Sequence, residues 1–424
     1  MSKEITLNHI TKIEGHAKLV LGIDKGKVRR CELSSIEGSR YFEGMLKGRR
    51  YDEAHEMTSR ICGICSCAHV VTSLMAIENA MGVVVSEQTE KLRVLLTLGE
   101  RIRSHATHLY FLALPDYLGY ESALAMASKY KKELKQALHM MKVGNRIITL
   151  VGGRDLHPVS ATVGGWLSLP SQEDVREINH LLHGIKKDAL ATCKLFFSLK
   201  YPQFESSGES FSLVDESEYA VLKGRFVSEE SSFEIHEYRK FIKEYHEARS
   251  TANFVVKEGK HYMVGALSRL NNSSVFLSRD AQRMLKKSGI KLPSRNPFEN
   301  NLAQAIEMVH CIDHALKMCE ELDLHDEKVV DVVLREGTGV GAIEVPRGTL
   351  WHEYQVDGGG CIVNANIITP TAQNLLNIQE DIREFVPRIM HLNKEGMVLE
   401  IERLIRSYDP CFSCSAHFLE VNWC

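Results

Sequence analysis

The sequence has no long apolar run. Hydrophobic residues make up 44% of its 424 positions, yet no stretch approaches the roughly 18 consecutive apolar residues that a membrane-spanning helix needs. The opening residues, "MSKEITLNHI", contain no apolar core of signal-peptide length. These absences predict a cytoplasmic protein with no direct membrane span.

An excess of one charge sign is also missing. The chain has 52 basic and 55 acidic residues, which gives a formal net charge of −3. There is therefore no electrostatic reason to expect nucleic acid as a partner. Acidic and basic residues are mixed along the chain, and we interpret most of them as solvated helix faces.

Cysteine is sparse and odd in number, with 11 residues, which argues against a disulfide framework. Cys31, Cys193 and Cys361 lie in apolar or mixed surroundings, as small buried residues do. Cys311 and Cys319 lie in a helical pattern, about 12 Å apart along a helix axis. That separation is too large for one shared ion, so we assign both to the core.

The chain has no internal repeat and no low-complexity linker. Residues 1–40 read as strands with a hairpin turn at Asp24–Gly26, and strand character returns over 328–371. Long amphipathic helical patterns fill most of the rest, apart from an irregular or strand-bearing stretch at 201–234. The prediction is one α+β domain over 1–424, predominantly α: a large helical bundle with small β-sheets contributed by the N-terminal and C-terminal thirds.

Two cysteine pairs stand near opposite ends of the chain. "RICGICSCAHV" contains Cys62 and Cys65, and "DPCFSCSAHF" contains Cys411 and Cys414. A Cys-x-x-Cys turn places two sulfurs on one side, so two such pairs make a four-thiolate site that selects soft metals. A zinc ribbon fits the ligand count, but its pairs are joined across a short hairpin. A redox dithiol needs a βαβ setting that is not evident. Spacing alone leaves zinc and a redox metal equally open.

Together these motifs resemble the two signatures of the large subunit of nickel–iron hydrogenases. The resemblance extends over essentially the whole chain, because further motifs occur in the family's order: "TKIEGHAKLV", "RYFEGMLKGR", "SHATHLYFLALPD", "EVPRGTL" and "IITPTAQN". The quinone-site subunits of respiratory complex I share the family's fold but lack the cysteines. Another sequence, "GTGVG" at 337–341, lacks the residues of a phosphate loop and reads as a turn.

The resemblance implies a bimetallic centre. Nickel would be held by all four thiolates, with Cys62 and Cys411 terminal. Cys65 and Cys414 would bridge to an iron that also carries carbon monoxide and cyanide. Cys67 follows the first pair and is interpreted as a bystander.

Heterolytic cleavage of dihydrogen needs a Lewis acid for the hydride and a base for the proton. The resemblance makes the terminal thiolate of Cys411 the candidate base. It places Glu14, in "KIEGH", beside that thiolate, where a carboxylate in a dry site can carry protons in both directions.

Further residues are assigned by the same resemblance. Arg347 and Thr371 would donate hydrogen bonds to the cyanides, and Arg347 suits this because its charge is permanent. Asp116 and Asp409 would orient that arginine, and His69 would donate to a bridging sulfur.

A second cation site is implied near the C-terminus. Glu43, His417 and the backbone carbonyl around Ile367 would hold a magnesium or an iron. Residues 418–424, "FLEVNWC", would be a maturation tail that a protease removes after His417.

The predicted function is therefore reversible cleavage of dihydrogen by the catalytic subunit of a cytoplasmic nickel–iron hydrogenase. No cysteines remain in a cluster pattern, so an iron–sulfur small subunit, with further flavin or iron–sulfur subunits, would carry the electrons. The alternative is a non-catalytic member: a hydrogen sensor, or a structural subunit of a respiratory-type complex.

Overall fold

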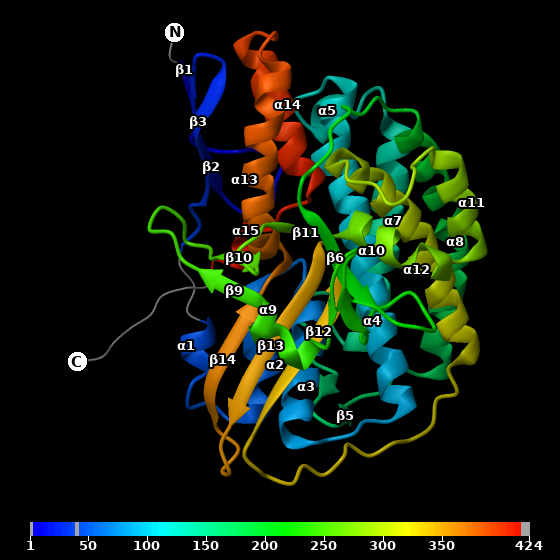
Figure 1. Ribbon diagram of the computed structural model, residues 1–424. Helices are drawn as coiled ribbons and strands as arrows, with labels where there is room; N and C mark the ends of the chain where they lie inside the picture. Colours follow the sequence, from blue (N-terminus) through cyan, green and yellow to red (C-terminus); the bar gives the residue numbers. More distant parts are fainter. Residues whose placement is uncertain (1–2, 39–41, 417–424) are drawn as a thin grey trace.

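The computed structural model describes residues 3–38 and 42–416 (Figure 1). The chain opens with an antiparallel sheet of β1 (Lys3–Leu7), β2 (Ala17–Asp24) and β3 (Lys27–Ser35). Side chains of β2 alternate between buried and partly buried, as expected for a strand with one face on the core. The tight turn after Asp24 confirms the predicted hairpin.

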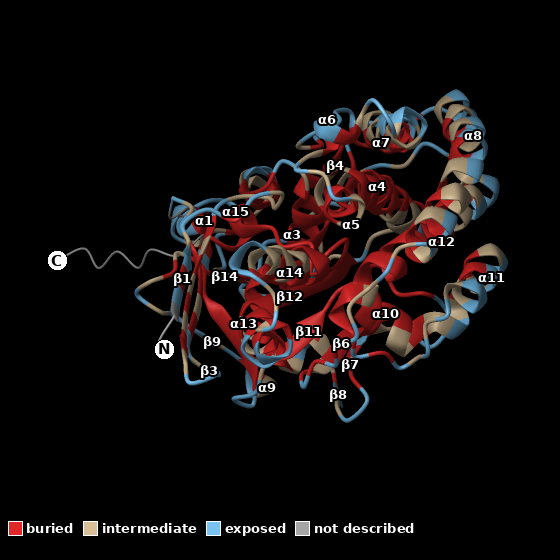
Figure 2. Ribbon diagram, turned by 90° about the horizontal axis from the view of Figure 1, so that it is seen from above, coloured by how far each residue is buried: buried red, intermediate tan, exposed pale blue. Residues whose placement is uncertain are grey.

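A helical bundle forms the largest part of the molecule. Its long helices are α4 (Glu87–Thr107), α7 (Lys131–Gly152), α8 (Gln172–Phe197) and α12 (Asn300–Glu321). Helix α4 packs against α7 and α12, and α8 packs against the same two helices. Figure 2 shows the buried faces of these helices turned inward. The predicted bundle is confirmed.

A second sheet carries the C-terminal strands β12 (Gly337–Val345), β13 (Gly348–Val356) and β14 (Ile362–Ile368). It packs on helix α3 (Ser66–Met81). The predicted turn at "GTGVG" is wrong, because these residues begin β12. A Cβ on Gly337, Gly339 or Gly341 would collide with the backbone of α3, so the glycines let strand and helix lie in direct contact.

The middle third also contributes strands, in part within 201–234, where the sequence analysis expects an irregular or strand-bearing stretch. Strands β6 (Glu209–Val214), β7 (Arg225–Val227), β8 (Ser232–Phe233) and β11 (Tyr262–Val264) form one sheet. Strands β9 (Ile242–Tyr245) and β10 (Phe254–Lys257) form another. Aromatic residues such as Phe211, Phe226 and Trp351 join these strands to β13 in a separate apolar cluster.

Helices α13 (Pro370–Ile389) and α14 (Lys394–Ser407) lie between the N-terminal sheet and the rest. The shorter helices are α1 (Phe42–Leu46), α2 (Ala54–Thr58), α5 (Leu114–Leu118), α6 (Ala123–Met126), α9 (Tyr238–Phe241), α10 (Ala266–Ser273), α11 (Arg279–Ser288) and α15 (Phe412–Ser415). The two-residue strands β4 (Ala161–Thr162) and β5 (Gly165–Trp166) pair with each other. Within the described ranges, every helix is too short or too polar to cross a membrane.

Segments from the two ends of the chain meet in the interior. Glu14 forms an isolated parallel bridge with Cys411, and the Phe412 N–H donates to the Glu14 carbonyl oxygen at 2.9 Å. This pairing brings the N-terminal loop onto the second cysteine pair.

Candidate metal centre

The first cysteine pair lies in a turn rather than inside a helix. Cys62 has an extended backbone, with φ −147° and ψ 134°, and Cys65 is the residue that precedes α3. Both are buried, with 2% and 5% of their surfaces exposed. The helical pattern of the surrounding sequence is therefore interrupted at the pair, and the turn lets both sulfurs point to one side.

The second pair follows α14. Asp409 has a positive φ of 51°, a conformation that Asp adopts more readily than most residues, and the chain there turns back into the core. Cys411 is extended and Cys414 lies one turn later in α15. Both are buried.

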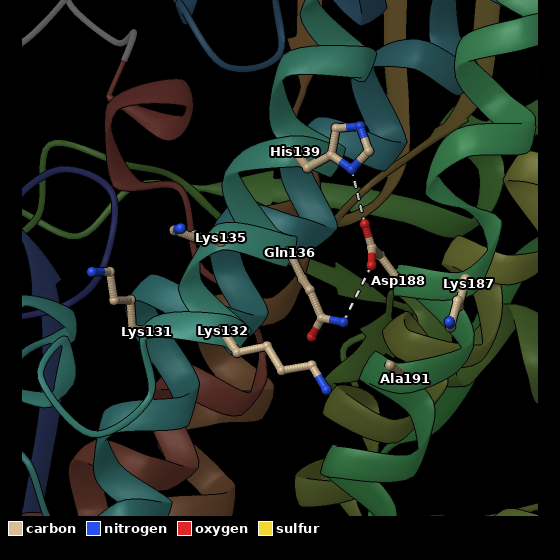
Figure 3. A pocket seen from close by; sticks show the side chains of 8 residues that line it. All are labelled: Lys131, Lys132, Lys135, Gln136, His139, Lys187, Asp188 and Ala191. Atoms are coloured by element: carbon tan, nitrogen blue, oxygen red, sulfur yellow. Dashed lines mark hydrogen bonds and ion pairs between the residues drawn. The ribbon is translucent and has the colours of Figure 1, made fainter.

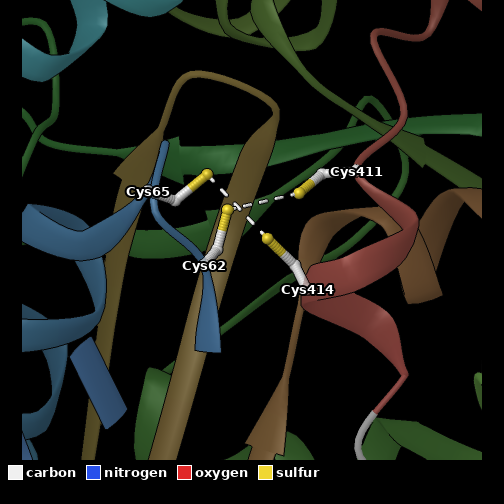
Figure 4. A group of neighbouring side chains, drawn as sticks. All are labelled: Cys62, Cys65, Cys411 and Cys414. Carbon is white, nitrogen blue, oxygen red and sulfur yellow. Dashed lines mark hydrogen bonds between the residues drawn. The ribbon is translucent and has the colours of Figure 1, made fainter. Parts of the chain in front are cut away.

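The four sulfurs converge (Figure 4). All four Sγ atoms lie within 4.8 Å of one another. Cys62 Sγ is 3.6 Å from Cys411 Sγ, and Cys414 Sγ is 4.0 Å from Cys65 Sγ. Among the residues that the structure describes, this is the one group of three or more His, Cys, Asp or Glu with metal-site spacing.

The electrostatics of this group fit a metal ion. Burial raises the pKa of the Cys411 and Cys414 thiols well above the usual value. Several thiolates in one dry pocket therefore need a bound cation to balance their charge. Thiolate sulfur selects soft metals such as nickel, iron and zinc, so the donor set fits a nickel–iron centre.

A small pocket lies beside the sulfurs. Its walls combine polar and apolar side chains: Cys65, His69, Val345, Arg347, Leu350, Thr369, Pro370, Thr371, Cys411 and Cys414. The apolar members exclude water, and the polar members supply hydrogen-bond donors. The sequence prediction named six of these ten residues.

Arg347 enters this pocket from the turn between β12 and β13. Its Nη1 donates to Cys65 Sγ at 3.2 Å. Its Nε donates to the Asp409 carbonyl oxygen at 2.8 Å and to Asp409 Oδ1 at 3.2 Å. The guanidinium is thus held between the two cysteine turns, with Asp409 where the prediction expected it.

Asp116 does not share this role. The sequence analysis expects it to orient Arg347, but its carboxylate binds Lys12 and Arg406 instead. Arg406 also donates to the Thr11 carbonyl oxygen at 2.8 Å. Asp116 and Arg406 thereby anchor the N-terminal loop that carries Glu14.

Glu14 contacts the second cysteine turn directly. Cys411 Sγ donates to Glu14 Oε2 at 2.9 Å, and the Ser413 N–H donates to the same oxygen at 3.2 Å. The Ser413 hydroxyl donates to Glu14 Oε1. Thr371 Oγ1 accepts from the Cys411 N–H at 2.8 Å. A carboxylate is therefore placed where it can receive a proton from the Cys411 thiol.

His69 is part of a buried hydrogen-bonded chain that the sequence did not reveal. Its Nδ1 lies 3.0 Å from His352 Nε2, and His352 Nδ1 lies 2.6 Å from the Tyr354 hydroxyl. The Tyr354 hydroxyl donates to Ser73 Oγ at 3.1 Å. The expected contact between the His69 ring and a bridging sulfur stays a prediction.

Arg269 is a further residue that sequence reasoning missed. It donates to the carbonyl oxygens of Val345 at 2.9 Å and Pro346 at 3.1 Å, directly before Arg347. Its other side forms a two-point ion pair with Glu307 at 2.5 and 2.7 Å. In the sequence Arg269 is a single arginine in the mixed stretch "ALSRLNNS", which gives no signal of this role.

The structure places Glu43 next to Ile367, two of the three residues expected at the second cation site, and the site itself stays a prediction. Glu43 Oε1 accepts from the Ile367 N–H at 2.6 Å. Burial raises the pKa of Glu43 to about 8, and the nearby Glu244 adds to this shift. A cation bound beside this carboxyl group would stabilise its ionised form. His417 lies outside the described residues.

A separate surface cavity of about 730 Å³ lies between α7 and α8 (Figure 3). It is lined by Lys131, Lys132, Lys135, Gln136, His139, Lys187, Asp188 and Ala191. Asp188 accepts from Gln136 Nε2 at 3.2 Å and pairs with His139 Nδ1 at 2.9 Å. The residues that line this cavity include no cysteine, so the cavity is separate from the metal centre.

Comparison with known proteins identifies the centre. The family model "Nickel-dependent hydrogenase" matches residues 40–142 and 245–417. Sulfhydrogenase 1 subunit alpha of Pyrococcus furiosus is 34% identical over 426 aligned positions, which cover 98% of this chain and 98% of the relative. The NAD-reducing hydrogenase HoxS subunit beta of Cupriavidus necator is 27% identical, with 99% and 96% covered.

The fold agrees with these relatives. The crystal structure of an NAD⁺-reducing NiFe hydrogenase in the H₂-reduced state superposes with a TM-score of 0.89 and 25% identity, covering 98% of this chain and 99% of that one. Four converging cysteines, the family model and this fold lead to one conclusion. The chain belongs to the nickel-dependent hydrogenase family and is the catalytic large subunit of a nickel–iron hydrogenase.

Proposed function

We propose that Cys62 and Cys411 are terminal ligands of nickel and that Cys65 and Cys414 bridge nickel to iron. The observation that carries this proposal is the convergence of four buried sulfurs within 4.8 Å, with a carboxylate 2.9 Å from one of them. When bound, the metal pair supplies the Lewis acid that heterolytic cleavage of dihydrogen requires.

Carbon monoxide and cyanide are proposed as further ligands of the iron. A cyanide nitrogen accepts hydrogen bonds, and the pocket offers the Arg347 guanidinium and the Thr371 hydroxyl beside Cys65 and Cys414. The positive charge of Arg347 is permanent, so it would balance the negative charge of these ligands throughout turnover.

The proton leaves by the N-terminal loop in this proposal. The Cys411 thiolate would accept the proton that cleavage releases, and the thiol so formed can donate it to Glu14 Oε2, which lies 2.9 Å from Sγ. Glu14 then passes the proton onward, with the Ser413 hydroxyl and N–H holding its two oxygens. Arg406, Asp116 and Lys12 hold the loop and keep Glu14 at the sulfur.

A magnesium or iron ion is proposed near Glu43. Its carboxylate, the Ile367 backbone carbonyl and His417 would supply oxygen and nitrogen ligands. The raised pKa of Glu43 supports this assignment, since a hard cation would replace the proton. Atomic absorption of the purified chain for magnesium, before and after Glu43→Gln, tests it.

An iron–sulfur subunit is proposed as the electron partner, with flavin or further iron–sulfur subunits beyond it. The segment 153–167 covers the first cysteine turn, because His157 donates to the Ser59 carbonyl oxygen at 2.8 Å and to Ser66 Oγ at 3.0 Å. Leu156 and Leu167 of that segment are 40% and 68% exposed. If this segment docks the iron–sulfur subunit, the Leu167→Asp variant should no longer copurify with that subunit. A cytoplasmic location stays a prediction.

Ligand substitution tests the proposal as a whole. Replacing Cys62, Cys65, Cys411 or Cys414 by Ser removes one thiolate and should abolish nickel retention and hydrogen uptake. The buried Cys193→Ser variant, whose sulfur lies elsewhere in the core, is the control and should keep both. Nickel and zinc contents with an infrared spectrum provide the readout. Full activity in any of the four variants, or zinc alone in the parent, contradicts the proposal.

A further inference from the structure

Arg103 of α4 holds the first cysteine turn from one side. Its Nη2 donates at 2.7 Å to the carbonyl oxygen of Ile64, which lies between the two cysteines. Its Nη1 donates to the Asp155 carbonyl oxygen at 2.9 Å and to Asn145 Oδ1 at 3.0 Å. The guanidinium therefore ties the turn to α7 and to the segment that follows α7.

Glu100, one turn earlier in α4, holds the other side. Its Oε2 accepts from the Cys67 N–H at 2.7 Å, and its Oε1 accepts from the Ala68 N–H at 3.3 Å. These N–H groups belong to the first turn of α3, whose N-cap residue Cys65 makes no side-chain cap. A carboxylate at a helix N-terminus satisfies the free N–H groups and the helix dipole. Cys65 thus lies between two backbone points fixed by α4.

Both side chains are withdrawn from water. Glu100 is 1% exposed and Arg103 is 6% exposed, and their charged groups lie 3.9 Å apart. An apolar pair would fill the same space without the cost of removing two charges from water. What the charged pair adds is hydrogen bonding to the backbone of the turn.

The same two helices carry a second buried ion pair. Arg93 of α4 donates to both carboxylate oxygens of Glu78 of α3, at 2.6 and 2.7 Å. Both residues are buried. This pair joins the helices near the opposite end of α3, and its side chains make no hydrogen bond to residues 62–68 within the described structure. It provides a matched control for stability without positioning.

We propose that Glu100 and Arg103 are positioning residues that hold the Cys62–Cys65 turn in its ligand geometry before any metal arrives. The inference rests on the proposed function, because it takes Cys62 and Cys65 to be ligands. It adds that α4 builds half of the site in the metal-free chain. The metals would then bind to the Cys62–Cys65 pair, which is already in place, and the Cys411–Cys414 turn would close over them.

The test uses the metal-free full-length chain titrated with Co²⁺, followed by thiolate-to-cobalt charge-transfer absorbance. Glu100→Gln and Arg103→Met should each weaken Co²⁺ binding by about 10- to 100-fold, the usual effect of removing a group that orients a metal ligand. Arg93→Met should bind Co²⁺ like the parent, although it loses a comparable buried ion pair. Arg103→Lys, which keeps the charge but not the planar fork, should be intermediate.

Hydrogen exchange gives a readout that needs no variant. In the metal-free parent, the amides of Cys67 and Ala68 should exchange slowly because Glu100 accepts from both. Rapid exchange at these amides overturns the proposal, as does parental Co²⁺ affinity in both Glu100→Gln and Arg103→Met. An equal loss of affinity in Arg93→Met shows a general stability effect and also overturns it.

A Cys62→Ser arm separates this inference from the proposed function. Parental Co²⁺ binding in Cys62→Ser means that the ligand assignment itself is wrong. Weak binding in Cys62→Ser with parental binding in the Glu100 and Arg103 variants means that the ligands are right and the positioning role is wrong.

Discussion

At the scale of single residues, the carboxylate of Glu14 is the group that we propose carries the proton away from the site. It accepts from a ligand thiol and from two groups of Ser413. In this position a carboxylate can take up and release a proton, whereas an amide could only form hydrogen bonds.

Glu14→Gln is therefore expected to block proton transfer and leave the metals in place. The amide keeps the shape but cannot take up and release a proton, so hydrogen–deuterium exchange should fall by at least about 100-fold. Carbon monoxide and cyanide infrared bands should stay at their parental positions. Glu4→Gln, an exposed substitution in β1, is the control. Parental exchange in Glu14→Gln means that protons leave by another route.

Asp381 makes a separate prediction about pH. Burial raises its pKa from 3.8 to about 7, so the folded chain keeps this proton while the unfolded chain loses it. Its contribution to stability is full below about pH 4 and is lost as the pH rises to about 7. Asp381→Asn should remove this loss, so its melting temperature relative to the parent should rise over that range. A constant difference between the two proteins would contradict the assignment.

The limits of sequence reasoning are clear at this scale. Each cysteine pair has the spacing of metal ligands, and the family resemblance predicted that the two pairs share one site, which the structure confirms. Glu100, Arg103 and Arg269 carry no such spacing. Charges in helical patterns are read as solvated faces, yet these three are almost fully buried. A pattern gives the angle of a residue around its own helix, but not which neighbour covers that face.

At the scale of elements, the contact between β12 and α3 sets the position of both Arg347 and Cys65. Helix α3 begins directly after Cys65, and β12 ends two residues before Arg347. The glycines of β12 bring the strand onto the helix backbone.

Gly339→Ala is expected to push these elements apart. Its Cβ would meet the backbone of Ala76 and Ala80, which cannot move aside as a flexible side chain could. Overpacking of this kind costs about 1–3 kcal/mol, and thermal unfolding should detect it. The control is Gly358→Ala, where a Cβ meets nothing within 4 Å. Equal melting temperatures for the two variants would contradict the packing argument.

Elements were predictable where one physical signal dominated. Ser86, a typical N-cap residue before a helical pattern, caps α4: its hydroxyl accepts from the Thr89 N–H at 3.0 Å. At Cys62 the apolar helical spacing of the sequence continues although the backbone is extended, so the spacing does not mark this turn. The turn predicted for "GTGVG" was wrong because glycine occurs both in turns and in strands that approach another backbone closely, and the sequence does not distinguish the two.

At the scale of the whole molecule, the second cysteine turn lies near the end of the chain and pairs with the N-terminal loop. Residues 418–424 follow that turn directly and lie outside the described part of the chain. We predict that a protease removes these residues when the active enzyme forms.

The intact mass of the active, nickel-containing chain tests this prediction. Cleavage between His417 and Phe418 should remove the mass of seven residues, "FLEVNWC", and the nickel-free chain should keep them. An active nickel-containing chain that still ends at Cys424 means that the tail is not removed for function.

The bridge between Glu14 and Cys411 has a consequence for the order of events during synthesis. These partners are 397 positions apart, so their pairing is among the highest-contact-order steps available to the chain, and such contacts form late. The helical bundle can form on the ribosome while the second half of the site is still unmade. We therefore expect the centre to be completed after much of the surrounding fold, so that the metals would enter while the second cysteine turn is still open.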